Sequence, residues 1–456
     1  MVGSRPDVVD LLRLAGPVAL ARLGIIGMGI VDVVVVGQLA PNELPHQALG
    51  WAPTSVFLVA GIGLLQGVQV LAARCLGEKR LEAAGVVLRR GLVLALIAGF
   101  VAAGLMWLGG ARIFTVFGIG EALASPSAPV MAILALSIPL HLLFVSGTFF
   151  LEAIKKPGIG TAVMWAANVV NLVLNLFWVP EHGAIGSAWA TVGARVFLAG
   201  AMLLWIYFLR DGALYGVRKL GGDGPNYRAL LAVGIAAAVS QAVEAGAFAA
   251  MTVIAGRISA DTVSAYQILL NLMAFVFMIA LGLAAASAVL VSEAVGRKAP
   301  ADVARAGWTG IAINAVAMIC AAIVILLFAE PIGRAYTADV GLAAFITSLM
   351  WIAALVLHPD GAQVVAASAL RARGDNWFPT FSHILAYAVA MPLLGYWLAE
   401  HQGMGVAGLL FAIFWSSVLS AAVLLARWWA LANKPAPAHI SDAPIASVLD
   451  AEVRDV

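Results

Sequence analysis

Charge is scarce in this sequence and cysteine is nearly absent. Only 11% of the 456 residues are Asp, Glu, Lys or Arg, whereas about a quarter is usual in soluble domains. The formal net charge of +2 is spread over short segments, so nothing favours nucleic-acid binding. The two cysteines, Cys75 and Cys320, lie near a predicted loop and inside an apolar run, so neither a disulfide nor redox chemistry is expected.

The motifs of ATP-driven and metal-dependent chemistry are also missing. No run of the form Gly-x-x-x-x-Gly-Lys-[Ser/Thr] occurs, so ATP hydrolysis is not expected of this chain. The seven histidines show no spacing typical of metal ligands. We therefore expect no cofactor, no catalytic residue and no transition-metal site.

Long apolar runs dominate what is present. Hydrophobic residues make up 63% of the chain and the mean hydropathy is +1.00. A helix needs about 20 apolar residues to cross a bilayer. This predicts an all-α integral membrane protein with twelve spans, at residues 11–36, 48–73, 86–108, 127–151, 159–179, 186–209, 229–256, 264–293, 306–328, 343–370, 379–399 and 405–432.

Basic residues indicate the orientation of these spans. Of the 26 Lys and Arg residues, all except Arg22, Arg112, Arg195, Arg257 and Arg334 fall in segments on the same side as the N-terminus. Because basic residues concentrate in cytoplasmic loops, we expect both termini in the cytoplasm.

The second half of the sequence repeats the first at one constant shift, which carries Gly37 onto Gly256. The same shift aligns Gly63-Leu64 with Gly282-Leu283, Gly91 with Gly310, and Leu151 with Leu370. Each half holds six spans, an even number, which predicts two six-helix bundles related by a pseudo-two-fold axis along the membrane normal. The predicted parts are an N-terminal half (1–209), a cytoplasmic linker (210–228), a C-terminal half (229–432) and a disordered cytoplasmic tail (433–456).

Three carboxylates fall well inside predicted spans. An ionisable group at bilayer depth costs several kcal/mol unless it is paired or hydrated, so Asp32, Glu244 and Asp360 are candidate functional residues. Asp360 follows Pro359, whose missing N–H frees a backbone carbonyl, and a carboxylate beside a carbonyl oxygen suits a hard cation. The alternative is a buried structural ion pair with Arg22 or Arg195.

Amide side chains accompany these carboxylates. Asn171 and Asn175 are one helical turn apart and share a face, where their oxygens can complete a site with Asp32. They are equally consistent with hydrogen bonds that hold neighbouring helices together, as are Gln267 and Asn271. Glu152, at the inner end of a span, is expected to be solvated or to snorkel to the membrane surface.

Several of these segments together resemble the multidrug and toxic compound extrusion (MATE) transporter family, in its NorM-like bacterial branch. The resemblance rests on Met28-Gly-Ile-Val-Asp32 with Gly37, and on Asp360 followed by Gln363-Val-Val-Ala-Ala-Ser-Ala-Leu370-Arg371 and Gly374-Asp375. Asn171, Asn175 and Ala190-Thr191 are similarly placed, as are Glu244 and Tyr266-Gln267.

The resemblance implies two cation or proton sites. In the C-terminal half the site would be formed by Glu244, Gln267 and Asp360, possible ligands of Na⁺. In the N-terminal half it would be formed by Asp32, Asn171, Asn175 and Thr191. The sequence departs from the family at Val356, where many relatives carry an aromatic residue, and in having Arg22 and Arg195 at mid-depth.

These features favour a monomeric secondary transporter that exports amphipathic cationic organic compounds in exchange for Na⁺ or H⁺. A lipid-linked precursor flippase of similar architecture is an alternative. An integral membrane transferase is a further one, but it would need acid, base or metal groups near a loop, whereas the candidate residues here lie within spans.

The distribution of basic residues generates a topological prediction. Reporters inserted in the 210–228 linker and fused after Ala432 should both report the cytoplasm. The measurement is the activity of a reporter that works on only one side of the membrane, and a periplasmic signal at either position would contradict the orientation.

Overall fold

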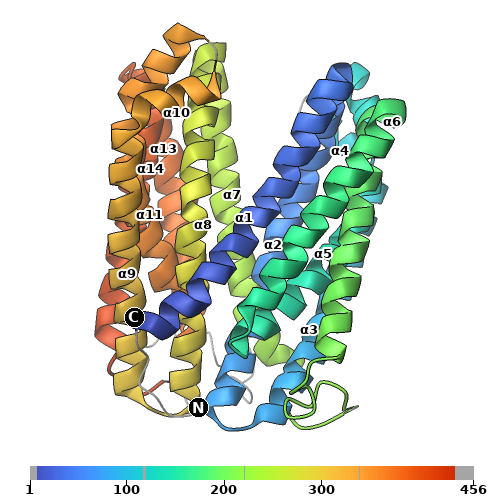
Figure 1. Ribbon diagram of the computed structural model, residues 1–456. Coiled ribbons are helices and arrows are strands. Elements are labelled where there is room, and N and C mark those ends of the chain that lie inside the picture. The colour runs from blue at the N-terminus through green and yellow to red at the C-terminus, as the bar shows by residue number, and fades with distance from the viewer. Residues whose placement is uncertain (1–7, 117–119, 220, 338, 437–456) are drawn as a thin grey trace. The chain divides into compact units, whose positions relative to one another are not determined.

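The computed structural model describes residues 8–116, 120–219, 221–337 and 339–436, and every regular element in these ranges is helical (Figure 1). The elements are α1 (Val8–Leu39), η1 (Pro41–Glu43), α2 (Leu44–Gly77), α3 (Leu81–Gly109), α4 (Arg112–Val116), α5 (Glu121–Ala153), α6 (Pro157–Tyr207), α7 (Tyr227–Ile258), α8 (Ala260–Gly296), α9 (Pro300–Leu327), α10 (Ala329–Tyr336), α11 (Val340–Arg373), α12 (Trp377–His383), η2 (Ile384–Ala390), α13 (Met391–Gly395), η3 (Tyr396–His401) and α14 (Gly405–Leu431).

Eleven helices in the described ranges are long and apolar enough to cross a membrane. One of them, α6, contains 51 residues and changes direction at Gly183, whose φ of 54° and ψ of −131° are not helical. Glycine adopts this backbone conformation without a Cβ clash. The helix therefore supplies two of the predicted spans, 159–179 and 186–209, and the predicted all-α, twelve-span membrane fold is confirmed.

The span predicted at 379–399 is a continuous but irregular helix. It consists of α12, η2, α13 and η3, in which η2 and η3 are π-helical. Pro392 lies between these two wide segments, and proline removes one N–H donor from the helical ladder. The irregular backbone is therefore centred on the proline.

The helix boundaries repeat at the shift found in the sequence. The helices α1 and α7 begin at Val8 and Tyr227 and end at Leu39 and Ile258. Both the two starts and the two ends are separated by the same number of residues as Gly37 and Gly256. Left-handed turns repeat as well. Lys79 and Lys298 have φ values of 61° and 55°, which is uncommon for residues other than glycine. The duplication is thus expressed in backbone geometry as well as in sequence.

The described residues form two compact units. One contains residues 20–238. The other contains residues 8–19 together with 239–436, so that α1 and α7 each contribute to both units. The boundaries predicted from the duplication, at 209/210 and 228/229, stay a prediction. From residue 437 onward the predicted tail lies outside the described residues.

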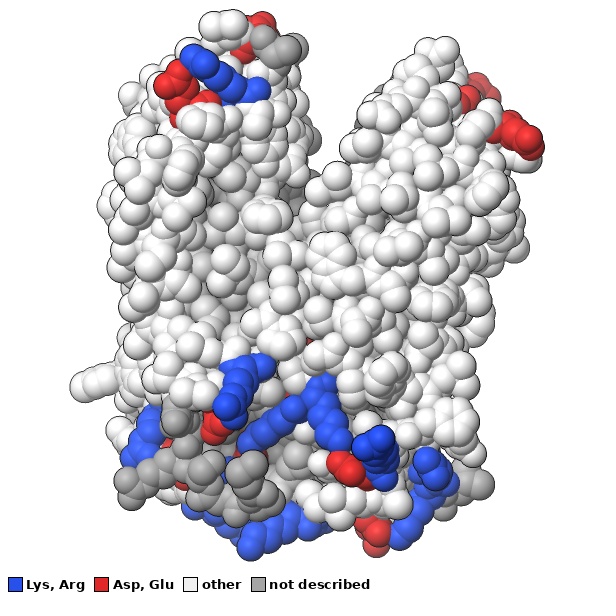
Figure 2. All heavy atoms as spheres, viewed as in Figure 1, with Lys and Arg blue, Asp and Glu red and all other residues white. Residues whose placement is uncertain are grey.

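Each unit is organised around one central helix. In the first unit α5 packs against α2, α3 and α6, and in the second α11 packs against α8, α9 and α14 (Figure 1). On the face shown in Figure 2, Lys, Arg, Asp and Glu side chains gather at the ends of each unit and leave an almost uncharged belt between them. Such a belt is what contact with hydrocarbon requires.

Close packing of α3 against α5 depends on a glycine. A Cβ placed at Gly99 would collide with the backbone of Pro139, whereas a Cβ at Gly104 on the same helix meets nothing within 4 Å. Small residues allow membrane helices to approach one another in this way.

We therefore predict that Gly99→Leu destabilises the protein by about 1–3 kcal/mol, the usual range for overpacking, whereas Gly104→Leu leaves stability unchanged or slightly higher because leucine is the better helix former. The measurement is thermal unfolding of the detergent-solubilised chain. Equal midpoints of thermal unfolding for the two variants would show that the α3–α5 contact does not require a small residue at position 99.

Candidate functional site

The carboxylate of Asp32 is buried in α1 and is held by three side chains of α6. Asp32 is 7% exposed. The amide nitrogens of Asn171 and Asn175 donate hydrogen bonds to its Oδ1 at 3.0 and 2.7 Å, and Thr191 Oγ1 donates to Oδ2 at 2.8 Å. The structure thus brings together all four residues predicted for the site of the N-terminal half.

The bend at Gly183 makes this arrangement possible. Asn171 and Asn175 precede the bend, and Thr191 follows it. A Cβ added at Gly193 would lie 2.7 Å from Leu174 Cδ1, so the segment after the bend folds back along the segment before it. Both segments of one helix can therefore reach the same carboxylate from different sides.

Two amide oxygens in the site have no hydrogen-bond partner among the described residues. They are Asn171 Oδ1 and Asn175 Oδ1, and both residues are fully buried. Buried polar atoms are normally bonded. Amide oxygens beside a carboxylate can accept a hydrogen bond or coordinate a hard cation, so the set is suited to a positively charged guest.

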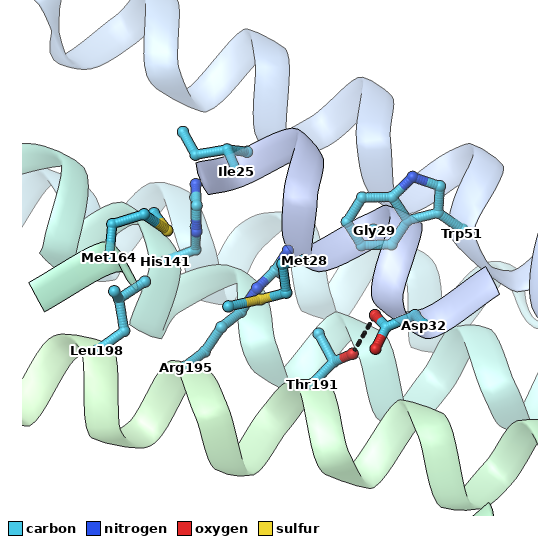
Figure 3. A pocket seen from close by; sticks show the side chains of 10 residues that line it. All are labelled: Ile25, Met28, Gly29, Asp32, Trp51, His141, Met164, Thr191, Arg195 and Leu198. Atoms are coloured by element: carbon cyan, nitrogen blue, oxygen red, sulfur yellow. Dashed lines mark hydrogen bonds between the residues drawn. The ribbon is translucent and has the colours of Figure 1, made fainter. Parts of the chain in front are cut away.

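A small cavity adjoins Asp32, as Figure 3 shows. Its free space is about 10 Å³, close to the least that holds one water molecule. The residues that line it come from α1, α2, α5 and α6: Ile25, Met28, Gly29, Asp32, Trp51, His141, Met164, Thr191, Arg195 and Leu198. The cavity is therefore water-sized and has both acidic and basic groups in its wall.

Arg195 is the basic group of this cavity. It is 2% exposed, its Nη1 donates to Ser137 Oγ at 2.6 Å, and its guanidinium lies 5.4 Å from the ring centroid of Trp51. Its positive charge also acts on Asp32. One of the two arginines that the sequence places at mid-depth thus lies at the candidate site.

Arg22 is paired elsewhere. Its Nη2 lies 3.9 Å from Glu152 Oε1, and Gln69 Nε2 donates to Glu152 Oε2 at 2.5 Å. Glu152 is 2% exposed, so the expectation that it is solvated is wrong. Placement at a helix end did not reveal that α2 and α5 pack against one another there and exclude solvent. The ion pair formed by α1 therefore involves Glu152 and not Asp32.

In the C-terminal half, the half-buried carboxylate of Asp360 is also hydrogen-bonded. Its Oδ1 accepts from Gln363 Nε2 at 3.4 Å, from the Tyr387 hydroxyl at 3.3 Å and from Ser417 Oγ at 3.2 Å. Tyr387 and Ser417 are fully buried, and their hydroxyl oxygens lie 3.2 Å apart. Three helical segments, α11, η2 and α14, therefore meet at this carboxylate.

Sequence reasoning missed Tyr387 and Ser417. Single hydroxyl groups are common in membrane helices, so neither residue stood out, although His383 lies four residues before Tyr387 and Ser420 lies three residues after Ser417. The internal repeat held a weak signal, because it aligns Tyr387 with Asn168, another buried polar residue of the candidate region.

Glu244 and Gln267 are placed differently from each other. Glu244 on α7 is partly buried, and the charges of Asp360 and Arg371 act on it. Arg371 is 5% exposed, and its Nε and Nη2 have no hydrogen-bond partner in the described ranges. Gln267 on α8 donates instead to Thr252 Oγ1 at 3.1 Å. The two carboxylates are thus electrostatic neighbours, whereas the inclusion of Gln267 in their site stays a prediction.

Comparisons with known sequences find relatives along nearly the whole chain. A family model described as MatE matches residues 17–177 and 236–397, and the two matched segments begin at positions that the internal repeat aligns. A probable multidrug resistance protein NorM of Caulobacter vibrioides is 42% identical over 429 residues, 92% of this chain and 91% of the relative. The multidrug resistance protein PmpM of Pseudomonas aeruginosa is 28% identical over 420 residues, 88% and 87% of the two chains.

Solved structures share the fold. A MOP superfamily transporter from Pyrococcus furiosus superposes with a TM-score of 0.87 at 18% identity, covering 95% of this chain and 98% of that one. A eukaryotic MATE transporter gives a TM-score of 0.85 at 18% identity, with 94% and 97% covered. These likenesses support the predicted layout of two six-helix bundles.

The Thr191 hydroxyl provides a test of the Asp32 site. Hydrogen bonds to charged groups contribute about 1.5–3 kcal/mol, so Thr191→Val should lower the free energy of unfolding by about that amount, and by much less in an Asp32→Asn background. Thermal unfolding of the four proteins in detergent measures the coupling.

Thr148→Val is the matched control, because this buried hydroxyl donates to the backbone oxygen of Phe144 at 3.0 Å rather than to a carboxylate. Thr148→Val should lower the free energy of unfolding by the same amount in the unmodified protein and in the Asp32→Asn variant. A cost of Thr191→Val that is independent of Asp32 would show that the bond contributes nothing to holding the carboxylate.

Proposed function

We propose that this chain, which belongs to the MATE family and to its NorM-like branch, is a secondary transporter that exports organic compounds in exchange for H⁺ or Na⁺. The chain is a multi-pass membrane protein with eleven membrane-length helices in its described ranges, one of them bent into two spans. An enzymatic role such as a transferase is set aside, because the family is one of transporters.

The observation that carries the proposal is the hydrogen-bonded carboxylate of Asp32 inside an apolar span. A bare charge in hydrocarbon costs several kcal/mol. Three donors from α6 offset part of this cost, and a bound proton removes the charge altogether. The ionised form of Asp32 is therefore stabilised by its three hydrogen-bond donors, and the protonated form carries no charge through the apolar membrane interior. Ion coupling requires two such forms.

The carboxylates of the C-terminal half suit a cation for a different reason. Glu244 and Asp360 act on each other electrostatically, and two like charges at one site favour a shared positive ion. Tyr387 and Ser417 contribute hydroxyl oxygens beside Asp360, and oxygen ligands are those that hard cations prefer. We assign Na⁺ to this half, with Gln267 as a further ligand, and H⁺ to Asp32.

Exchange follows if substrate and coupling ion compete for the same negative charge. A cationic compound neutralises a carboxylate as the ion does, and a half that carries one or the other can reorient, whereas an empty charged half is hindered. The 10 Å³ cavity is too small for an organic molecule, so Arg195 acts there on Asp32 rather than on a substrate. Amphipathic cations remain the proposed substrates.

The internal duplication supports alternating access, in which helical repeats move as bodies. The protein would act as a monomer in the inner membrane of a bacterial cell, with both termini in the cytoplasm and without a cofactor. The relatives named for multidrug resistance make drug-like amphipathic cations the first compounds to test.

The test is ethidium efflux from proteoliposomes under separately imposed Na⁺ and H⁺ gradients. We expect Asp32→Asn, Glu244→Gln and Asp360→Asn each to reduce gradient-driven efflux by about tenfold or more, equivalent to about 1.4 kcal/mol of coupling, while leaving a folded protein. Stabilisation of the detergent-solubilised chain by Na⁺ should vanish in Glu244→Gln and Asp360→Asn and persist in Asp32→Asn.

Glu181→Gln is the control, because Glu181 is an exposed carboxylate of α6 near the bend. It should transport as the unmodified protein does. Full gradient-driven efflux by the triple variant with all three carboxylates neutralised would refute ion coupling through these residues.

A further inference from the structure

A groove opens on the surface of α6 where this bent helix begins and ends. Its volume is about 690 Å³, within the range of about 300–1,000 Å³ that is usual for small-molecule sites. The residues that line it include Lys156, Ile159, Leu204, Trp205, Phe208 and Arg210. None of its lining residues belongs to the cavity beside Asp32. The proposed transport mechanism therefore gives this groove no role.

The wall of the groove is apolar and exposed. Leu204, Trp205 and Phe208 are 60%, 52% and 68% exposed. They lie at the end of α6, a helix long and apolar enough to cross a membrane. Residues of this kind contact hydrocarbon, and tryptophan is enriched where hydrocarbon meets the headgroups. The wall therefore suits an acyl chain rather than a soluble ion.

The mouth of the groove carries an excess of positive charge. The side chain of Arg210 is exposed and has no hydrogen bond or ion pair within the described ranges. Lys156 Nζ lies 2.6 Å from Asp211 Oδ2, so Arg210, the neighbour of Asp211 in sequence, lies close to Lys156 as well. The lysine and the aspartate are 33% and 52% exposed, and exposed pairs contribute little to stability. Two cations beside one carboxylate leave one positive charge in excess.

The internal repeat identifies the counterpart of this groove in the C-terminal half. Gly183 and Gly405 each precede the last span of their half, with φ values of 54° and 56°. When these two glycines are aligned, buried positions of α6 coincide with buried positions of α14. Such pairs include Ala190 with Ala412, Met202 with Leu424, and Ile206 with Trp428. In this alignment Trp205 corresponds to Arg427.

The start of α6 corresponds to the start of α12. The shift that carries Gly37 onto Gly256 places Lys156 on Asp375 and Ile159 on Phe378. The backbone agrees, because the N–H groups of Lys156 and Asp375 each donate to the carbonyl five residues earlier, at 2.7 and 2.9 Å. Three residues that line the groove therefore have counterparts in the C-terminal half.

These three counterparts contact one another. Arg427 Nε lies 2.9 Å from Asp375 Oδ2, and the Arg427 guanidinium lies 4.7 Å from the ring centroid of Phe378. The groove lacks this bridge, because Trp205 replaces the arginine and Lys156 replaces the aspartate. No acidic side chain is among the residues that line the groove. The C-terminal half thus supplies an internal counter-ion at this place, whereas the groove presents a lysine without one.

We propose that the groove binds one anionic phospholipid, with its phosphate at the basic mouth formed by Lys156 and Arg210 and an acyl chain along Leu204 and Phe208. Basic pockets between membrane helices bind acidic headgroups in this way. An ammonium group has three donors, so Lys156 can bond to the phosphate and keep Asp211. The lipid supplies the counter-ion that Arg427 supplies to Asp375. The inference does not depend on which compounds or ions the protein transports.

Native mass spectrometry of the full chain in detergent tests the proposal, with dioleoyl phosphatidylglycerol and dioleoyl phosphatidylcholine as the added lipids. The unmodified chain should retain one phosphatidylglycerol in preference to phosphatidylcholine. Lys156→Gln combined with Arg210→Gln should weaken this binding by about tenfold or more, because two cations near the headgroup are lost. The control is Arg13→Gln combined with Arg305→Gln, which removes the same charge from two exposed side chains outside the groove and should leave binding unchanged.

A second variant reproduces the contact of the C-terminal half. Lys156→Asp combined with Trp205→Arg should close the groove with an internal ion pair and abolish the retention of phosphatidylglycerol. Its midpoint of thermal unfolding should equal or exceed that of the unmodified chain, which shows that the variant is folded. Retention of the lipid by this folded variant would overturn the assignment to the groove.

Equal weakening in the Lys156/Arg210 variant and in its control would refute the proposal, because it would indicate only the attraction of anionic lipid to a basic surface. Displacement of phosphatidylglycerol by inorganic phosphate would indicate a site for a soluble anion and would refute a lipid site. Equal retention of phosphatidylcholine by the unmodified chain would contradict recognition of an anionic headgroup. These last two measurements need no substitution, so they decide the proposal even where a variant does not fold.

Discussion

The cost of placing a carboxylate in hydrocarbon is the constraint on which the N-terminal half depends. Asp32 is tolerated because Asn171, Asn175 and Thr191 donate to both of its oxygens. All three donors belong to one helix that reverses direction at Gly183. The bend, the amide pair and the carboxylate therefore form one arrangement, and a Cβ at position 183 would strain it, since the backbone there has a positive φ.

The two halves stabilise their buried charges with different side chains. Helix boundaries and left-handed turns repeat between the halves, yet the charges do not. Glu152 of α5 occupies the position of Arg371 in α11, and Arg74 of α2 that of Glu293 in α8. Glu152 pairs with Arg22, whereas Arg371 acts on Glu244. At these two pairs of positions the charge has thus changed sign although the backbone repeats.

Packing tolerates this divergence because it depends on shape. Gly91 lies against Val68 and Ser146, and Gly310 lies against Ser287 and Val365, which are the same positions in the repeat. Small residues at these places let helices approach whatever charges lie further along them. Each half can therefore hold its own set of ionisable groups, with Asp32 and Glu152 in one and Glu244 and Asp360 in the other.

Hydrophobic periodicity and basic loops were enough to predict the twelve spans, because a bilayer imposes a minimum apolar length on every helix. The shared face of Asn171 and Asn175 was also predictable, since two residues one turn apart lie on the same side of a helix, whereas their grouping with Asp32 and Thr191 was implied by the resemblance to the MATE family. Only the tertiary structure placed Tyr387 and Ser417 on Asp360, buried Glu152 and set His141 beside Arg195. Contacts between helices depend on their rotation and crossing, which side-chain packing determines and which spacing along one helix does not encode.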